Sequence, residues 1–391
     1  MNTNTTIGIH DLSFATGEFV LPHTELAAHT GVEIGKYHVG IGQRSMSIPA
    51  ADEDIVTMAA AAAAPIVERW GADRIRTVVF ATETPIDQSK AAGIYVHSLL
   101  NLQPSTRVVE LKQACYGGTA GLQFALGLVQ RDPSQQVLVI AGDVSRYELD
   151  SPGEATQGAA AVAMLVGADP ALIRIDPPSG LHTADVMDFW RPNYLSTALV
   201  NGQESIAAYL QAVEGVWKDY TEQGGRTLSE FSAFCYHQPF TKMAYKAHRH
   251  LFNTTGHDLD EDQMSEMLRR TTAYNEVLGN SYTASMYVAL ASLLDHSSDL
   301  TDQLIGFVSY GSGCVAEFFG GIVVPGYLEH LRTDAHRAIV HRRQPIGHGT
   351  YRELHERSLP QDGGHHLTPK QTTGPFRLAG LSGHKRLYET S

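Results

Sequence analysis

The sequence predicts an α/β protein, and two observations support this prediction. Helix-period segments lie between several short apolar runs, which is the alternation that α/β folds show. The chain also has 391 residues, so we expect two domains or two fused halves instead of one core. The apolar runs with the length and composition of buried strands are 76–82, 107–111, 136–142, 159–167, 232–237, 304–311 and 315–324.

The expected helices follow from their periodicity and from strong helix formers. Residues 52–70 begin with acidic residues that suit a helix N-terminus and continue through an alanine run that favours close packing between layers. The same pattern recurs at 119–130, 205–220 and 283–294. Clusters of Gly, Pro and Thr at 168–184 and 221–228 indicate boundaries.

The end of the chain has a different character. Residues 343–380 are rich in His, Gly, Pro and Thr and show little periodicity, which indicates a long surface excursion. The closing segment FRLAGLSGHKRLY at 376–388 suits one more pair of strands.

Composition and charge narrow the class of protein. The formal net charge of -13 argues against nucleic acid as the main partner, so an anionic ligand needs a local basic patch. No apolar run is long enough for a membrane span, and the N-terminal residues do not resemble a secretory signal. Three cysteines make no disulfide framework, so we expect a reducing, cytoplasmic setting with free thiols.

The stretch VVELKQACYGGTAGLQFALGLV places Cys115 between a strand and a helix. A helix N-terminus lowers the pKa of a cysteine and favours the thiolate, which attacks carbonyl groups. Gly117 and Gly118 leave room for a substrate beside the backbone. The helix is apolar almost all round, so we expect it to be buried and Cys115 to lie at the bottom of a cleft. A small packing cysteine is the plainer interpretation, and we prefer it for Cys235 and Cys314.

A thiol nucleophile needs an acid–base partner, and two segments supply candidates. Glu83 follows a strand, where a partly dry cleft would raise the pKa of its carboxyl, although spacing alone does not separate it from Asp87. His237 ends another strand, before Pro239, and suits acid–base or carbonyl-binding work. A solvated surface carboxylate and an ordinary histidine are the plain alternatives.

Three further features could hold a substrate. A basic stripe with the spacing of one helix face could bind phosphates, or it could simply face solvent; it consists of Lys242, Lys246, Arg249 and His250. The Asn280 amide precedes a helix and could hold a substrate oxygen or cap that helix. The turn at 311–313 and the backbone N–H of Cys115 are our candidates for an oxyanion hole, although the turn also suits a hairpin.

With these motifs in view, the chain resembles hydroxymethylglutaryl-CoA synthase in its bacterial mevalonate-pathway form. The likeness covers nearly the whole length and rests on long, family-specific stretches. They are GIGQRSMSIP (40–49), ATETPIDQSKAAG (81–93), ELKQACYGGTAG (110–121), GEATQGAAAVAML (153–165), DVMDFWRP (185–192), FCYHQPFTKMAYKA (234–247), LGNSYTASMYVALASLL (278–294) and SYGSGCVAEFFGG (309–321).

The resemblance implies a thiolase-like fold, in which two duplicated halves form five layers, αβαβα, in a homodimer. The halves would be 1–168, with the cysteine and the glutamate, and 169–391, with the histidine, the basic helix and the Gly-Ser-Gly turn. Cys115 would carry the acyl group, Glu83 would deprotonate the acetyl methyl group, and His237 would bind and protonate the acetoacetyl carbonyl. Other positions match family residues: Thr156, Ser205, Lys246, Asn280 and Ser312 would contact the coenzyme-A thioester, and Asp143, Asp188 and Tyr116 would support the site.

The implied reaction condenses acetyl-CoA with acetoacetyl-CoA and water to give 3-hydroxy-3-methylglutaryl-CoA, through an acetyl-cysteine. It needs no metal or redox cofactor, because the thioester already acidifies the carbon. Three alternatives remain open. They are a related synthase of polyketide β-branching that acts on an acyl carrier protein, a decarboxylating condenser similar to β-ketoacyl synthase III, and a silent binding protein with the same fold.

Overall fold

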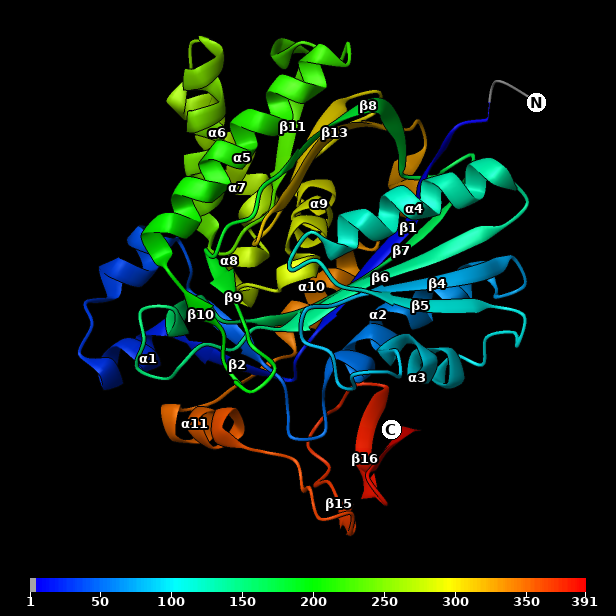
Figure 1. The fold of residues 1–391 in the computed structure, drawn as a ribbon, viewed down its shortest axis with the longest axis vertical. Coiled ribbons are helices and arrows are strands. Elements are labelled where there is room, and N and C mark those ends of the chain that lie inside the picture. Colours follow the sequence, from blue (N-terminus) through cyan, green and yellow to red (C-terminus); the bar gives the residue numbers. More distant parts are fainter. Residues whose placement is uncertain (1–4) are drawn as a thin grey trace.

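A mixed sheet of two similar halves organises the protein, whose computed structural model describes residues 5–391 (Figure 1). The strand order is β11-β12-β13-β8-β1-β7-β6-β4-β5. The strands are β1 (Ile7–Thr16), β4 (Ile75–Ala81), β5 (Arg107–Leu111), β6 (Gln136–Val144), β7 (Ala159–Ala168), β8 (Ile173–Thr183), β11 (Phe231–Tyr236), β12 (Leu304–Gly311) and β13 (Val315–Val323).

The strand directions reveal the duplication. In the first half β4 runs parallel to β6, and β7 runs antiparallel to both β6 and β1. The second half repeats this pattern, because β11 runs parallel to β12, and β13 runs antiparallel to both β12 and β8. Within the sheet, the halves meet where β1 pairs with β8, at Gly8–Arg174 and Ile9–Ile173.

Helices pack on both faces of each half-sheet and complete the five layers. Along β4, Val79 and Ala81 share the core that includes α4 (Gly117–Arg131) and α9 (Ser285–Asp295). Val78 and Phe80 point the other way, to α2 (Ile55–Trp70) and α3 (Ala92–Leu99). In the second half, α5 (Gly202–Glu222) packs on β8 and β13, with α6 (Thr241–Thr255) beside it. The predicted thiolase-like αβαβα arrangement is confirmed.

The central helices differ in burial. Every residue of α9 is buried, whereas α4 leaves one side open, with Phe124 59% exposed. The expectation of an almost fully buried helix after Cys115 is therefore wrong for α4. Its buried face, which lies against the sheet, combines small residues with Leu122 and Val129.

All seven predicted strands and all four predicted helices form, with ends within a few residues of those expected. Most of the segment 168–184, which we predicted as a boundary, is strand β8. Pro177 and Pro178 prevented the prediction of this strand from the sequence. They fall at a register shift between Phe319–Ser179 and Gly320–Asp176, where the ladder requires no N–H from them.

The expected surface excursion at 343–380 is instead a packed segment that contains a helix. Tyr351 is 1% exposed and its hydroxyl donates to Glu154 Oε1 at 2.9 Å. Arg377 donates to Asp52 Oδ2 at 3.0 Å. The predicted closing strand pair is confirmed by β16 and β17. The elements here are β14 (Gln344–Pro345), α11 (His348–Glu356), β15 (His365–Leu367), β16 (Phe376–Ser382) and β17 (Lys385–Thr390).

Shorter elements complete the chain: α1 (His23–Thr30), β2 (Phe19–Pro22), β3 (Ser45–Ile48), β9 (Phe189–Trp190), β10 (Leu199–Val200), α7 (Glu261–Thr272), α8 (Asn275–Leu278) and α10 (Thr333–His341). Within residues 5–391, no helix has both the length and the apolar character needed to cross a membrane.

Candidate active site

Cys115 lies in the tight turn between β5 and α4. Ala114 has a φ of 42°, in the left-handed region that non-glycine residues rarely adopt, and this lets the chain turn into the helix. The space beside Gly117 and Gly118 is filled by neighbouring parts of the protein and is not available to a substrate. A Cβ on Gly118 would lie 2.8 Å from the carbonyl oxygen of Thr283, so Gly118 allows the two halves to approach.

The thiol of Cys115 lies against the carboxyl group of Glu83. Cys115 donates to Glu83 Oε1 across 2.9 Å, although 32 residues separate the two. Burial, followed by the charge of Glu83, raises the pKa of the Cys115 thiol well above its usual range. The expectation that the helix N-terminus lowers this pKa is therefore wrong, because desolvation and a neighbouring carboxylate outweigh the helix.

Glu83 has a raised pKa for related reasons. Burial, and then the nearby charge of Asp143, raise the pKa of Glu83 to about 8. The Cys115–Glu83 pair is thus neutral at neutral pH and gains a negative charge only near pH 8. Asp87, the rival that the sequence left open, is exposed and accepts instead from the backbone N–H groups of Ser89 and Lys90.

Asp143 fixes the loop that carries Glu83. Its buried Oδ1 accepts from the backbone N–H groups of Glu83 and Thr84 at 2.9 and 3.0 Å, and from the hydroxyl of Thr82 at 2.7 Å. Its Oδ2 accepts from the Thr283 hydroxyl at 2.6 Å. Asp143 therefore ties the Glu83 loop to the opposite half of the molecule, which agrees with a supporting role.

His237 follows β11, and its imidazole is 3% exposed. Its Nδ1 lies 2.6 Å from the hydroxyl oxygen of Ser285, which also accepts from the backbone N–H of Gln238 at 3.1 Å. Burial lowers the pKa of His237 to about 3, so the ring is neutral at neutral pH. Sequence reasoning missed Ser285, because a serine inside a buried helix carries no signal of its partner.

A cavity of about 620 Å³ brings the distant candidates together. Cys115 and His237 both line it, and four of the five expected substrate contacts line it as well: Thr156, Ser205, Asn280 and Ser312. Aromatic rings that the sequence analysis did not single out form much of its wall: Tyr147, Phe189, Tyr209, Tyr282 and Tyr310. Glu83 faces a second pocket of about 470 Å³ on its other side.

Lys246, the fifth expected contact, is exposed and does not line the cavity. Its ammonium group lies 5.4 Å from the ring centroid of Phe240, which does line the cavity. The basic stripe is also partly neutralised, because Arg249 pairs with Glu261 at 2.7 Å and His250 lies 3.7 Å from Glu214. Among the described residues, Lys242 and Lys246 are therefore the cations of this face that have no carboxylate partner.

The remaining candidates support the cavity walls. Asp188 Oδ2 accepts from the Tyr310 hydroxyl at 2.7 Å, and its Oδ1 accepts from the backbone N–H of Gly313 at 3.0 Å. That N–H is therefore not free for an oxyanion, which corrects part of our expectation. The Tyr116 hydroxyl donates to Glu317 at 2.7 Å and anchors the start of α4.

The remaining polar and thiol groups are bonded to the backbone or packed in the interior. The Asn280 side-chain oxygen accepts from the backbone N–H of Tyr282 at 2.9 Å. Cys235 and Cys314 are 0% and 3% exposed, which agrees with packing roles. In the part of the chain that the structure describes, no three His, Cys, Asp or Glu side chains are grouped to hold a metal ion.

Comparison with known proteins agrees with this geometry. The family description "Hydroxymethylglutaryl-coenzyme A synthase N terminal" matches residues 3–171, and its C-terminal counterpart matches 173–277 and 257–339. Hydroxymethylglutaryl-CoA synthase of Enterococcus faecalis is 39% identical over 91% of this chain and 93% of its own. The polyketide biosynthesis 3-hydroxy-3-methylglutaryl-ACP synthase PksG of Bacillus subtilis is 32% identical, over 89% and 87%.

A solved structure of a hydroxymethylglutaryl-CoA synthase complexed with CoA superimposes with a TM-score of 0.94 and 36% identity, over 99% of this chain and 100% of the other. The fold, the family descriptions and the near full-length relatives therefore agree, and this chain belongs to the hydroxymethylglutaryl-CoA synthase family.

Proposed function

We propose that this chain condenses acetyl-CoA with acetoacetyl-CoA and water to give 3-hydroxy-3-methylglutaryl-CoA and CoA. The observation that carries the proposal is the 2.9 Å contact between Cys115 and Glu83 at the end of a cavity that His237 also lines. A nucleophile, a carboxyl base and a carbonyl-binding imidazole are the groups that this carbon–carbon bond formation needs.

In the proposed first step, the sulfur of Cys115 attacks the acetyl thioester. The thiol proton ends on the departing CoA sulfur, so the step gives acetyl-cysteine and free CoA. The raised pKa of the thiol makes this transfer necessary, because little thiolate exists beforehand.

In the second step, the Glu83 carboxylate takes a proton from the acetyl methyl group, and the resulting enolate attacks the ketone of acetoacetyl-CoA. A neutral His237 donates a hydrogen bond to the ketone oxygen as it becomes an alkoxide. Because a neutral imidazole is a poor proton source, we propose that His237 binds the ketone oxygen but does not protonate it. Glu83 returns the proton that it took from the methyl group to the alkoxide. Water then hydrolyses the thioester at Cys115.

The substrate carrier distinguishes the two functions that family members have. The 32% identical PksG is a 3-hydroxy-3-methylglutaryl-ACP synthase, and the 39% identical Enterococcus enzyme is a hydroxymethylglutaryl-CoA synthase. We therefore propose coenzyme-A thioesters, held at the cavity mouth near Lys246. Incubation with labelled acetyl-CoA and either free acetoacetyl-CoA or its carrier-bound form tests this. Condensation only on the carrier would refute it.

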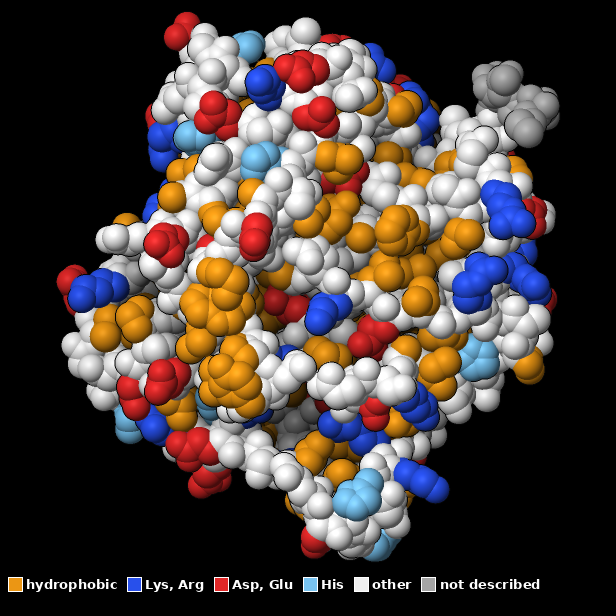
Figure 2. Space-filling view, in the orientation of Figure 1, with side chains coloured by type: hydrophobic (Ala, Val, Ile, Leu, Met, Phe, Trp, Pro, Cys, Tyr) orange, Lys and Arg blue, Asp and Glu red, His pale blue; other side chains and the backbone are white. Residues whose placement is uncertain are grey.

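We also propose a homodimer in a cytoplasmic setting, with no bound cofactor. Among residues 5–391, the edge strand β5 pairs only with β4, and Val109 on it is 40% exposed. Figure 2 shows apolar side chains gathered over α4, which carries the 59% exposed Phe124. Light scattering should give twice the chain mass, and Phe124→Lys should shift it toward the monomer. A monomeric wild-type protein at micromolar concentration would refute this.

A further inference from the structure

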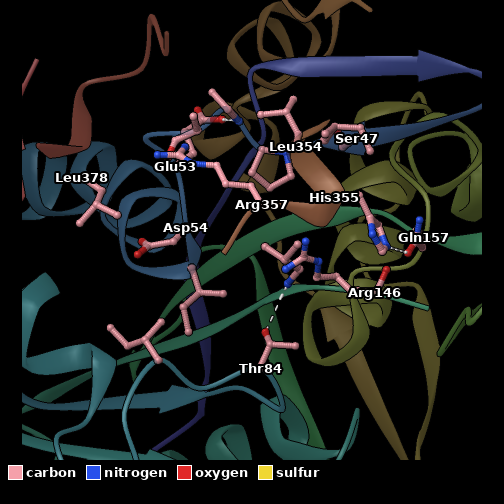
Figure 3. Close-up of a pocket in the computed structure, with 18 of the residues that line it drawn as sticks. Ser47, Glu53, Asp54, Thr84, Arg146, Gln157, Leu354, His355, Arg357 and Leu378 are labelled. Carbon is pink, nitrogen blue, oxygen red and sulfur yellow. Dashed lines mark hydrogen bonds between the residues drawn. The ribbon is translucent and has the colours of Figure 1, made fainter. Parts of the chain in front are cut away.

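A pocket beside the C-terminal segment contains an arginine without a counter-charge. The pocket has a volume of about 280 Å³ and lies between the first half of the fold and residues 351–386 (Figure 3). Arg146, from the loop after β6, points into it. Among the residues that the structure describes, the Arg146 guanidinium makes no hydrogen bond and no ion pair.

An unpaired, partly buried guanidinium is costly, because it loses water without gaining an acceptor. Burial, followed by the charge of Arg191, lowers the pKa of Arg146, which is the direction expected of an uncompensated charge. Arg191 also lines the pocket and donates only to the backbone oxygen of Glu83, at 3.1 Å. Among the described residues, four arginines line this space, Arg146, Arg191, Arg357 and Arg386, and only Arg386 pairs with a carboxylate, in a protein of net charge -13.

The acidic residues of the pocket do not supply the missing charge. Glu53 accepts from the backbone N–H groups of Glu18 and Ala50, each at 2.8 Å. Asp54 caps α2 and accepts from Arg386 at 3.3 Å. Both carboxylates therefore bond to other groups of the protein. The Arg146 guanidinium remains able to bind an anion.

The rest of the lining is largely aliphatic. Ile86 comes from the Glu83 loop, Leu354 and Leu359 come from α11 and the chain after it, and Leu378 comes from β16. An ordinary hydrated ion gains little from such walls, whereas a short hydrocarbon group gains about 25 cal/mol for each Å² buried. The lining fits an anionic head group with a small apolar tail.

We propose that this pocket binds a small organic anion, with a phosphate or carboxylate head on Arg146 and a short aliphatic group against Leu354, Leu359 and Leu378. The site is separate from the cavity that holds Cys115 and His237. It adjoins the catalytic loop through Thr84, Arg146 and Arg191, which line both this pocket and the one that Glu83 faces. Binding there joins the C-terminal segment to the first half.

Calorimetry on the full chain saturated with CoA tests the proposal, because CoA occupies the other anion-binding region. The probes are n-butyl phosphate and butyrate, with inorganic phosphate and n-butanol as comparisons. We expect saturable binding of at least one of the two amphiphilic anions, at least tenfold tighter than inorganic phosphate. No saturable binding, or equal binding of inorganic phosphate, would overturn the proposal.

Three substitutions test whether the anion binds in this pocket. Arg146→Gln should weaken binding at least tenfold. Leu359→Glu, which keeps Arg146 but places a negative charge at the partly exposed rim, should do the same even if the first variant folds poorly. Arg269→Gln removes a distant surface arginine that pairs with Glu266 and should leave the affinity unchanged. Wild-type affinity in both pocket variants would overturn the assignment. Because binding is measured without turnover, this outcome is independent of the proposed reaction.

Discussion

Replacing Glu83 by glutamine separates the two chemical steps. The structure places the carboxyl of Glu83 in an environment that raises its pKa from 4.5 to about 8, which corresponds to roughly 5 kcal/mol against ionisation. Only about one tenth of the molecules therefore carry the carboxylate at pH 7. Because the carboxylate is the form that takes the methyl proton, condensation should rise about tenfold per pH unit below pH 8 and level off above it.

The Glu83→Gln variant cannot accept that proton, so we expect condensation to fall by roughly 10²- to 10⁴-fold and to lose this pH dependence. Acetyl transfer to Cys115 should stay within about tenfold of the wild type. The variant removes the charge of Glu83, which is one cause of the raised thiol pKa, so the thiol ionises more easily.

A rapid-quench single turnover with labelled acetyl-CoA measures both quantities, as acetylated protein and as condensed product. Asp87→Asn is the matched control, since Asp87 is an exposed carboxylate on the same loop and should not affect either step. If acetylation falls as far as condensation, or if the wild-type profile bends near pH 4.5, the reasoning is wrong.

Three other predictions address the nucleophile, the imidazole and the central helix. Cys115→Ala should abolish labelling of the protein by acetyl-CoA, and any remaining label on the purified variant contradicts its role. Ser285→Ala removes the partner of His237 and should slow condensation about three- to tenfold with acetylation unchanged in the same quench assay; equal slowing of both would argue against a His237-specific effect. Gly118→Ala should lower the free energy of unfolding in urea by about 1–3 kcal/mol, because its Cβ would lie 2.8 Å from a carbonyl oxygen. Gly127→Ala in the same helix, where a Cβ meets nothing within 4 Å, should not destabilise the protein.

Local patterns determined the elements and the identity of most site residues. Apolar runs of strand length between helix-period segments predicted the seven strands and four helices, because burial on both faces leaves a continuous apolar signature. β8 was missed, since its two prolines are the extra residues of a register shift in β8 opposite Phe319 and Gly320 of β13, and only the pairing of the two strands reveals that shift. The packed C-terminal segment was missed because its contacts, such as Arg377 with Asp52, join residues more than 300 positions apart.

The sequence by itself determined the α/β class, the Cys-Gly-Gly turn before a helix, and the motifs through which Glu83, Cys115 and His237 resemble a known family. Only the tertiary structure decided that Glu83 and not Asp87 reaches the thiol, and that Asp143 and Ser285 hold the reacting groups. It also reversed the direction of the thiol pKa. Electrostatic effects depend on desolvation and on distances between side chains, and these exist only once remote segments of the chain have packed together.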